Sequence, residues 1–213
     1  MFPKNGATVP EIRFKGFTGD WNEEKLSYFI IKAVDNRGKT PPLNKNGKHP
    51  LIEVDALGNG APDYSRISKF LDDYSFNNFL RDHIRKGDIL FSTVGSIGLV
   101  SLIDDNKNAA IAQNIVAFRA KEGFIPKYLY ALFSNKNNKS LANKIAMKGI
   151  QPSIKVSQLL NVKYYITTNK DEQWKIGEYF KNLDKQISLH YTQLDKLNNI
   201  KKACFSKMFV AQD

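Results

Sequence analysis

The stretch DEQWKIGEYFKNLDKQISLHYTQLDKLNNIKKACFSKMF, residues 171–209, decides how the rest of the chain is organised. Apolar residues recur in it at alternating steps of four and three, a pattern that predicts a helix with a heptad seam. Because no proline or glycine follows Gly177 in this stretch, the helix could extend for roughly 45–50 Å at about 1.5 Å per residue. The seam positions are Ile176, Phe180, Leu183, Ile187, His190, Leu194, Leu197, Lys201, Cys204 and Met208.

A helix of this length cannot be covered by a small domain, and its acidic and basic residues nearly balance, which suits a protein partner. We therefore predict that it pairs with another long helix as a coiled coil. The predicted contact residues are Ile176, Phe180, Leu183, Ile187, Leu194, Leu197 and Met208. The alternative is an amphipathic helix folded back on its own domain, which the same periodicity permits.

The composition bounds the class of protein. A chain of 213 residues, 42% hydrophobic and 25% charged, is ample for one soluble core with an appended element. The single cysteine, Cys204, excludes an internal disulfide and indicates a reducing compartment. No apolar run approaches the length of a membrane span, and the N-terminus lacks a signal-peptide core, so we expect a cytoplasmic protein.

The positive charge is local. The net charge is +11, yet residues 123–170 contain eight lysines and no acidic residue, whereas basic and acidic residues nearly balance on either side. Asparagine and serine are interleaved with these lysines over residues 134–140, which suits phosphate binding and favours a nucleic-acid partner. The alternative is a basic face that serves only solubility.

Residues 1–170 are expected to form a mixed α/β domain ahead of the helix over 171–213, because strands and helices alternate without a regular βαβ repeat. Residues 35–60 are rich in turn formers and indicate a long polar loop. The sequence Gly95-Ser96-Ile97-Gly98 lacks the spacing and lysine of a P-loop, so a plain hairpin is favoured over a phosphate cradle. Expected strands cover residues 89–91, 99–103, 109–120 and 162–166, and expected helices cover 126–133 and 140–147, the second ended by Gly149.

No set of residues indicates catalysis. His49, His83 and His190 stand alone, without the spacing of a zinc or nuclease motif. The only proline-rich candidate for a methyltransferase loop, Thr40-Pro41-Pro42-Leu43, lacks the aromatic residue, and no cluster of carboxylates with a lysine suggests a nuclease. We therefore predict that the chain is not an enzyme.

Several short stretches follow one another in a familiar order: residues 10–17 through Trp21, 86–90 with 95–98, Gln113-Asn114, and 149–153. In this order and spacing the chain resembles the specificity subunit of type I restriction-modification enzymes, and it resembles one half of that subunit. Gln173, Ile176 and Phe180 look like the start of the spacer helix that follows each target recognition domain in the family. The resemblance implies recognition of double-stranded DNA, one half-site of a bipartite target for each domain.

By this resemblance, loops of the domain would contact bases and lysines would contact phosphates. Gln151 is the strongest candidate for a base edge, since its amide can pair bidentately with adenine, and the alternative role is to cap the turn after Gly149. The expected DNA-contacting residues are Lys39, Thr40, Asn44, Lys45, Ser96, Lys148, Gln151, Ser153 and Lys155.

The resemblance also implies partners. The chain would pair with a second half-length specificity subunit, as a homodimer or a hetero-pair, and would recruit DNA methyltransferase subunits and restriction/motor subunits. S-adenosylmethionine, ATP and magnesium are expected on those subunits, with no cofactor or metal on this chain. Two other hypotheses are a helical assembly module that binds a protein complex without reading DNA and an RNA-binding protein, the latter disfavoured by the lack of RRM and KH signatures.

Overall fold

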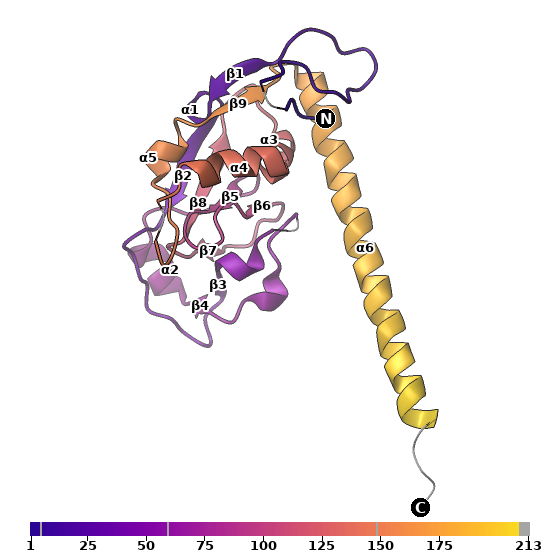
Figure 1. The fold of residues 1–213 in the computed structure, drawn as a ribbon. Coiled ribbons are helices and arrows are strands. Elements are labelled where there is room, and N and C mark those ends of the chain that lie inside the picture. The colour runs from indigo at the N-terminus through magenta and orange to yellow at the C-terminus, as the bar shows by residue number, and fades with distance from the viewer. Residues whose placement is uncertain (5, 59, 148, 209–213) are drawn as a thin grey trace, which may run out of the picture.

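The computed structural model describes residues 1–4, 6–58, 60–147 and 149–208, with side chains up to residue 206. It shows a mixed α/β domain followed by one long helix, as the sequence predicts (Figure 1). The strands are β1 Asn22–Lys25, β2 Ile30–Asp35, β3 His49–Ile52, β4 Phe70–Leu71, β5 Ile89–Ser92, β6 Val100–Leu102, β7 Ala110–Ile111, β8 Ile115–Ala120 and β9 Lys163–Ile166. The helices are α1 Leu26–Phe29, α2 Asp73–Phe79, α3 Pro126–Ser134, α4 Lys136–Lys144, α5 Val156–Leu159 and α6 Lys170–Met208, with short 3₁₀ turns at Val54–Ala56 and Tyr64–Arg66.

A four-stranded antiparallel sheet in the order β2-β8-β5-β6 forms the centre of the domain. Both faces of β5 and β8 are buried, because alternate residues of a strand point to opposite sides. Phe91 and Phe118 face a core that includes α3, whereas Leu90 and Ala117 face a second core that includes Ile52 of β3. Two covered faces explain why residues 89–91 form a continuous apolar run.

A smaller sheet, β4-β3-β7, lies partly in stretches for which the sequence predicted a polar loop and a single long strand. The predicted loop over residues 35–60 contains β3, which pairs with β4 and β7. The single strand predicted over residues 109–120 is two strands, because the chain turns at residues 112–114, where the Ile115 amide bonds the Ala112 carbonyl. The polar pair Gln113-Asn114 thus marks a turn between sheets.

The second predicted helix begins and ends earlier than expected. The Asn135 side chain accepts hydrogen bonds from the Asn137 and Asn138 amides, so it caps the N-terminus of α4. The helix ends at Lys144, and Gly149 is not its cap. Instead, the backbones of Met147 and Ser153 pair, with the Met147 amide 2.8 Å from the Ser153 oxygen, and residues 149–153 form a loop.

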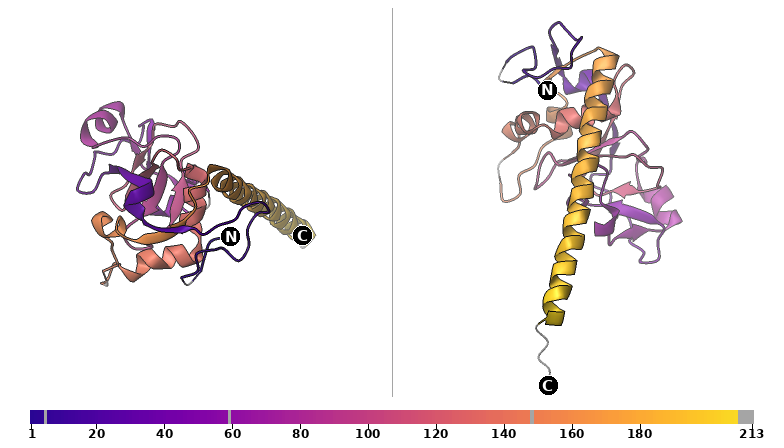
Figure 2. Two further views of the ribbon diagram at one scale, coloured as in Figure 1. Left: turned by 90° about the horizontal axis from the view of Figure 1, so that it is seen from above. Right: turned by 90° about the vertical axis from the view of Figure 1, so that its right-hand side faces the viewer.

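The long helix α6 has two halves with different surroundings, which we call the docked half, residues 170–184, and the projecting half, residues 185–208. The docked half packs against α3, with Ile176 only 2% exposed and Phe180 stacked on Phe2. Every described side chain of the projecting half is exposed. Figures 1 and 2 show this half extending beyond the domain.

The structure therefore corrects the predicted coiled-coil contacts. Ile176 lies in the core of its own domain, and Phe180 and Leu183 are half-buried there. The predicted residues left exposed are Ile187, Leu194 and Leu197, while the side chain of Met208 lies outside the described ones. Because the helix begins at Lys170 but packs into the core for four turns, the domain division at residues 170 and 171 stays a prediction.

Candidate nucleic-acid interface

The loops predicted to contact DNA meet at one end of the four-stranded sheet. In an antiparallel sheet, the end of one strand lies beside the start of its neighbour. The ends of β2 and β5 therefore lie beside the starts of β8 and β6. The segments that leave the sheet at this end are residues 36–48, 93–99 and 112–114.

Hydrogen bonds hold these segments together. The Gly38 amide lies 3.3 Å from Gln113 Oε1, and Gln113 Nε2 donates to the Thr40 hydroxyl. The Thr93 amide donates to the Asn114 carbonyl at 2.8 Å. The loop between β2 and β3 is thus tied to the β7–β8 turn, and that turn is tied to the end of β5.

The loop over residues 149–153 joins the same place from a distant part of the chain. The Gly95 amide donates to the Pro152 carbonyl at 2.9 Å, and the Ile154 amide donates to the Thr93 carbonyl at 2.9 Å. We call the resulting area, residues 37–40, 93–98, 113–114 and 149–155, the sheet-end surface. It contains six of the nine predicted DNA-contacting residues: Lys39, Thr40, Ser96, Gln151, Ser153 and Lys155.

The other three residues are not placed there. Asn44 Nδ2 donates to Asp72 Oδ2 at 3.1 Å, and Asn44 Oδ1 accepts from the Asn46 amide at 3.0 Å. This side chain therefore holds its own turn beside α2, and Lys45 follows it there. Lys148 lies outside the described residues.

Gln151 is exposed on the loop that reaches the sheet-end surface. Backbone hydrogen bonds between Met147 and Ser153 close the loop, so its closure does not depend on the Gln151 amide. Within the part of the chain that the structure describes, the Gln151 side chain has no hydrogen-bond partner. Its donor and acceptor pair is thus available for a ligand.

The segment Gly95-Ser96-Ile97-Gly98 is a hairpin connection between β5 and β6, as favoured from the sequence. Gly95 and Gly98 have φ values of 73° and 81°, which glycine adopts without steric cost. The amides of Gly95, Ile97 and Gly98 already bond carbonyls of Pro152, Gly95 and Ser92. Since these donors are taken, the segment is not built to cradle a phosphate.

Some lysines of the acid-free segment, residues 123–170, lie beside carboxylates from other parts of the chain. Lys163 pairs with Glu23 at 2.8 Å, a contact that raises the pKa of Lys163, and Lys127 pairs with Glu178.

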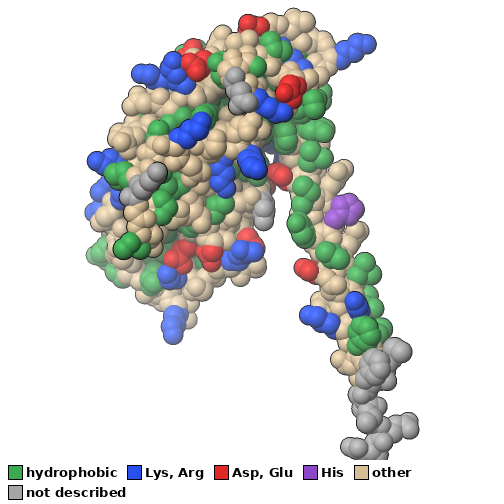
Figure 3. All heavy atoms as spheres, in the orientation of Figure 1, with side chains coloured by type: hydrophobic (Ala, Val, Ile, Leu, Met, Phe, Trp, Pro, Cys, Tyr) green, Lys and Arg blue, Asp and Glu red, His purple; other side chains and the backbone are tan. Residues whose placement is uncertain are grey.

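Lys139 packs its stem against Gly98, so α4 lies over the β5–β6 connection. Figure 3 shows Lys and Arg side chains across the middle of the domain with no acidic side chain between them.

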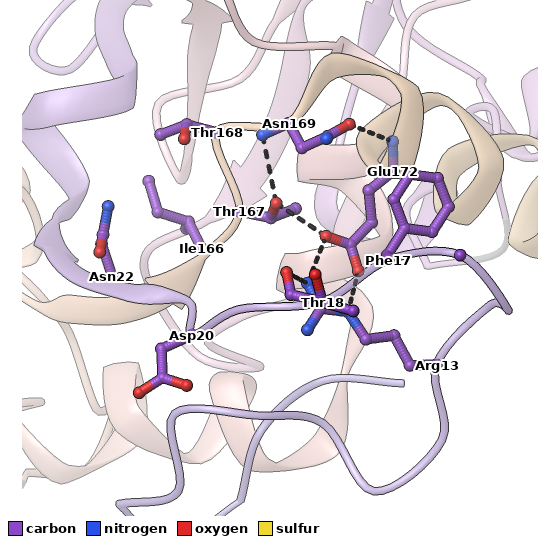
Figure 4. Close-up of a pocket in the computed structure, with 11 residues that line it drawn as sticks. Arg13, Phe17, Thr18, Asp20, Asn22, Ile166, Thr167, Thr168, Asn169 and Glu172 are labelled. Atoms are coloured by element: carbon purple, nitrogen blue, oxygen red, sulfur yellow. Dashed lines mark hydrogen bonds and ion pairs between the residues drawn. The ribbon is translucent and has the colours of Figure 1, made fainter.

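A polar pocket of about 240 Å³ lies at the start of α6 (Figure 4). Arg13 donates two hydrogen bonds, of 2.7 and 2.9 Å, to the buried carboxylate of Glu172, and these bonds raise the pKa of Arg13. The Thr167 hydroxyl donates to the same carboxylate at 2.8 Å, and Asn169 caps the helix through the Glu172 amide. These groups satisfy one another's hydrogen-bonding capacity, and the bonds attach the start of α6 to the domain.

Among the described residues there is neither a metal-binding cluster nor a membrane-spanning helix. No group of three or more histidine, cysteine, aspartate and glutamate side chains there has the arrangement of a metal site. Among the described helices, none combines the length and the apolar character that crossing a membrane requires.

Comparison with known proteins adds the family. Residues 19–199 match the model described as the type I restriction modification DNA specificity domain. The chain belongs to this family. Two similar relatives come from Methanocaldococcus jannaschii: the putative type I restriction enzyme MjaX specificity subunit, 25% identical over 197 residues, and the MjaVIII specificity subunit, 25% identical over 189 residues. The alignments cover 89% and 86% of this chain but 45% and 44% of the relatives, so the chain spans about half their length.

Solved structures confirm the fold of the specificity domain. The S subunit of a type I restriction-modification system from M. genitalium superposes with a TM-score of 0.63 at 15% identity, covering 95% of this chain and 48% of that one. The HsdS subunit from Thermoanaerobacter tengcongensis gives a TM-score of 0.58 at 20% identity, covering 98% and 47%.

Three residues that organise the sheet-end surface were not predicted from the sequence. Arg37 and Thr93 form a hydrogen bond across it, and Gln113 ties two of its loops. Arg37 stood within the polar loop and Gln113 among the family landmarks, so both carried a signal. Thr93 carried no such signal, because the sequence alone does not distinguish a buried threonine directly after a strand from other core residues.

Proposed function

We propose that this specificity domain recognises one half-site of a bipartite double-stranded DNA target through the sheet-end surface and contributes no catalytic group. The supporting observation is the set of hydrogen bonds that gathers segments from four parts of the chain at one end of a buried sheet. Side chains held on such a support keep their geometry before the ligand arrives, which lowers the cost of binding.

The residues of the surface divide by chemistry. Gln151, exposed and without a partner in the described part of the chain, would pair with an adenine edge in the major groove. Lys39 and Lys155 are exposed and would contact phosphates, with Thr40, Ser96 and Ser153 adding short polar contacts to the backbone. The two lysines carry charge that no described carboxylate neutralises.

The projecting half of α6 would pair with the same half of a second specificity chain, in a homodimer or a hetero-pair. Ile187, Leu194 and Leu197 are 52%, 51% and 63% exposed and recur at heptad steps. An apolar stripe of this kind on a helix that no domain covers is typical of a protein interface. Two paired helices would then set the distance between two half-sites.

The partners follow from this role. DNA methyltransferase subunits would bind S-adenosylmethionine and modify the target, and restriction/motor subunits would use ATP and magnesium. This chain would supply sequence recognition alone, in the cytoplasm.

Salt-dependent binding tests the DNA interface. Each phosphate contact that is lost lowers the slope of log affinity against log salt by about 0.9. We expect Lys155→Ala to lower the slope by about that amount on duplex DNA. The matched control is Lys163→Ala, because Lys163 belongs to the same acid-free segment but pairs with Glu23. Equal slopes for the wild type and Lys155→Ala would refute the placement of the interface.

The exposed stripe of α6 also favours a second function, a helical module that joins a protein complex without reading DNA. Copurification separates the two. A complex with a methyltransferase subunit that binds duplex DNA supports sequence recognition, whereas a dimer or complex indifferent to DNA supports the assembly module.

A further inference from the structure

Arg37 is the most unusual cation on the sheet-end surface. It follows the end of β2, and its guanidinium Nη2 donates to the Thr93 hydroxyl at 3.2 Å. Its Nε is buried, and within the described part of the chain it has no hydrogen-bond partner. A buried donor without an acceptor destabilises a protein, so Arg37 is held in this position at a cost in stability, which is typical of residues at functional sites.

The charge of Arg37 is also uncompensated. Three of the six arginines, Arg13, Arg66 and Arg119, pair with carboxylates. Arg37, Arg81 and Arg85 pair with none among the described residues, and of these three Arg37 alone belongs to the sheet-end surface. The acidic residue beside it in sequence, Asp35, is engaged elsewhere: Oδ2 lies 3.7 Å from Lys32 Nζ, and Oδ1 accepts from the Arg37 backbone amide at 3.1 Å. Among the described residues, the guanidinium therefore has no carboxylate beside it.

The backbone that carries Arg37 is fixed on both sides. Asn36 is buried, and its side chain accepts from the Arg81 amide at 3.2 Å and donates to the Ile111 carbonyl at 3.4 Å. The Lys39 amide closes a turn onto the Asn36 carbonyl at 2.9 Å. Since Thr93 is itself buried, the guanidinium is anchored to a rigid part of the sheet.

The place of Arg37 links it to the predicted base reader. The Thr93 residue that holds it also accepts, through its carbonyl, the Ile154 amide at the base of the loop that carries Gln151. Arg37 and Gln151 therefore lie on one hydrogen-bonded support.

Resting on the proposed function, we propose that Arg37 determines specificity by contacting the guanine edge of a G·C pair in the half-site. An arginine presents a planar fork of donors that matches guanine O6 and N7. Phosphate contacts need only a point charge, which the exposed lysines Lys39 and Lys155 supply. An anchored arginine at the centre of these loops is suited to orientation-dependent reading.

The test is selection of binding sites by the full chain from a pool of duplexes with a randomised central segment, comparing wild type, Arg37→Lys, Arg37→Ala and the neighbouring control Lys39→Ala. Arg37→Lys keeps the charge but loses the fork. We expect both Arg37 variants to lose about tenfold of the preference for guanine at one position while the other positions keep theirs. Lys39→Ala should weaken binding to all sequences alike.

The outcomes are distinguishable. A wild-type chain that selects no sequence would refute the proposed function itself and the role of Arg37 with it. A wild-type preference that both Arg37 variants retain would overturn the inference alone. Uniform weakening by Arg37→Ala that Arg37→Lys restores would identify a phosphate contact and would also overturn it. Thermal unfolding of each variant confirms folding, and Arg37→Lys maintains the test if Arg37→Ala does not fold.

Discussion

The two halves of α6 share one continuous helix and one heptad pattern, yet they meet opposite environments. In the docked half, Ile176 is buried, and Glu172 and Gln173 are buried polar residues with several hydrogen bonds each. In the projecting half, Leu194 and Leu197 are more than half exposed. The comparison teaches that apolar periodicity specifies a face to be covered but not what covers it.

Polar residues mark the boundary better than apolar ones. Gln173 donates to the Gly123 and Thr167 carbonyls and accepts from the Ile125 amide, so its amide joins the β8–α3 and β9–α6 connections to the helix. Buried polar groups with satisfied partners fix a unique arrangement. The described polar side chains of the projecting half are all exposed, so none of them fixes its orientation against the domain.

The largest expected effect concerns attachment of the docked half. Arg13→Ala would leave the buried carboxylate of Glu172 without its ion-pair partner, and breaking a buried pair costs about 3–5 kcal/mol. Urea unfolding at fixed protein concentration measures the loss. Lys163→Ala breaks an exposed pair with Glu23 and should change nothing measurable. Equal effects of the two variants would show that the Arg13 pair is not needed for docking.

The next effect concerns the projecting half. Leu194→Glu combined with Leu197→Glu should weaken self-association at least about a hundredfold, because like charges would oppose one another across a helix pair. Sedimentation velocity measures the association. The unfolding free energy of the monomer should change by less than about 0.5 kcal/mol, since both side chains are exposed. A monomeric wild type would exclude the homodimer and leave the hetero-pair, whereas a variant that still dimerises would contradict pairing through this face.

A smaller effect should appear where the helix crosses α3. A Cβ at Gly177 would lie 2.9 Å from the Tyr128 amide nitrogen and 2.9 Å from Lys127 Cβ. Alanine in a helix is normally about 1 kcal/mol better than glycine, yet we expect Gly177→Ala to destabilise by about 1–2 kcal/mol. The exposed control Asn199→Ala should be neutral or slightly stabilising. Chemical unfolding decides the sign, and a stabilised Gly177→Ala would exclude a close helix crossing.

The smallest effect depends on pH. Burial raises the pKa of the Asp184 carboxyl, and a hydrogen bond with the Tyr130 side chain offsets part of that rise. The folded protein therefore holds this proton more tightly than the unfolded chain, so its stabilising contribution is present at low pH and is lost as pH rises through the folded pKa.

Asp184→Asn should accordingly raise stability at pH 7, by under about 1 kcal/mol because the site is partly open to solvent, and should make no difference below about pH 3. Thermal unfolding across pH measures the difference. Asp195→Asn, on the projecting half, is the matched control and should show no such pH dependence.

Much of the architecture could be predicted from the sequence. The long helix, the buried strand Ile89–Ser92 and the proline-initiated helix Pro126–Ser134 each carry a strong local pattern, and the structure confirms them within a residue or two. Strand β3 and the break between β7 and β8 were missed. Short strands among turn residues form because distant strands pair with them, and no local pattern reports that pairing.

The candidate site was predicted in part for the same reason. Lys39, Gln151 and Ser153 were recognised as polar loop residues, and the structure brings them to one surface. Asn44 lies apart from that surface, and the sequence alone contains no sign of this because its partner, Asp72, lies 28 residues further along the chain. Arg37 gains its importance only from Thr93, 56 residues away.

The sequence by itself determined the helix, its heptad face, the excess of lysine and the succession of landmarks that marks the family, because each of these depends on residues close together in the chain. Tertiary structure decided which apolar residues remain exposed and which cations remain unpaired. Lys127 and Lys163 are neutralised by carboxylates from other elements, whereas Arg37 is not. Burial and charge compensation depend on neighbours in space, and those neighbours are set by the packing of the whole domain.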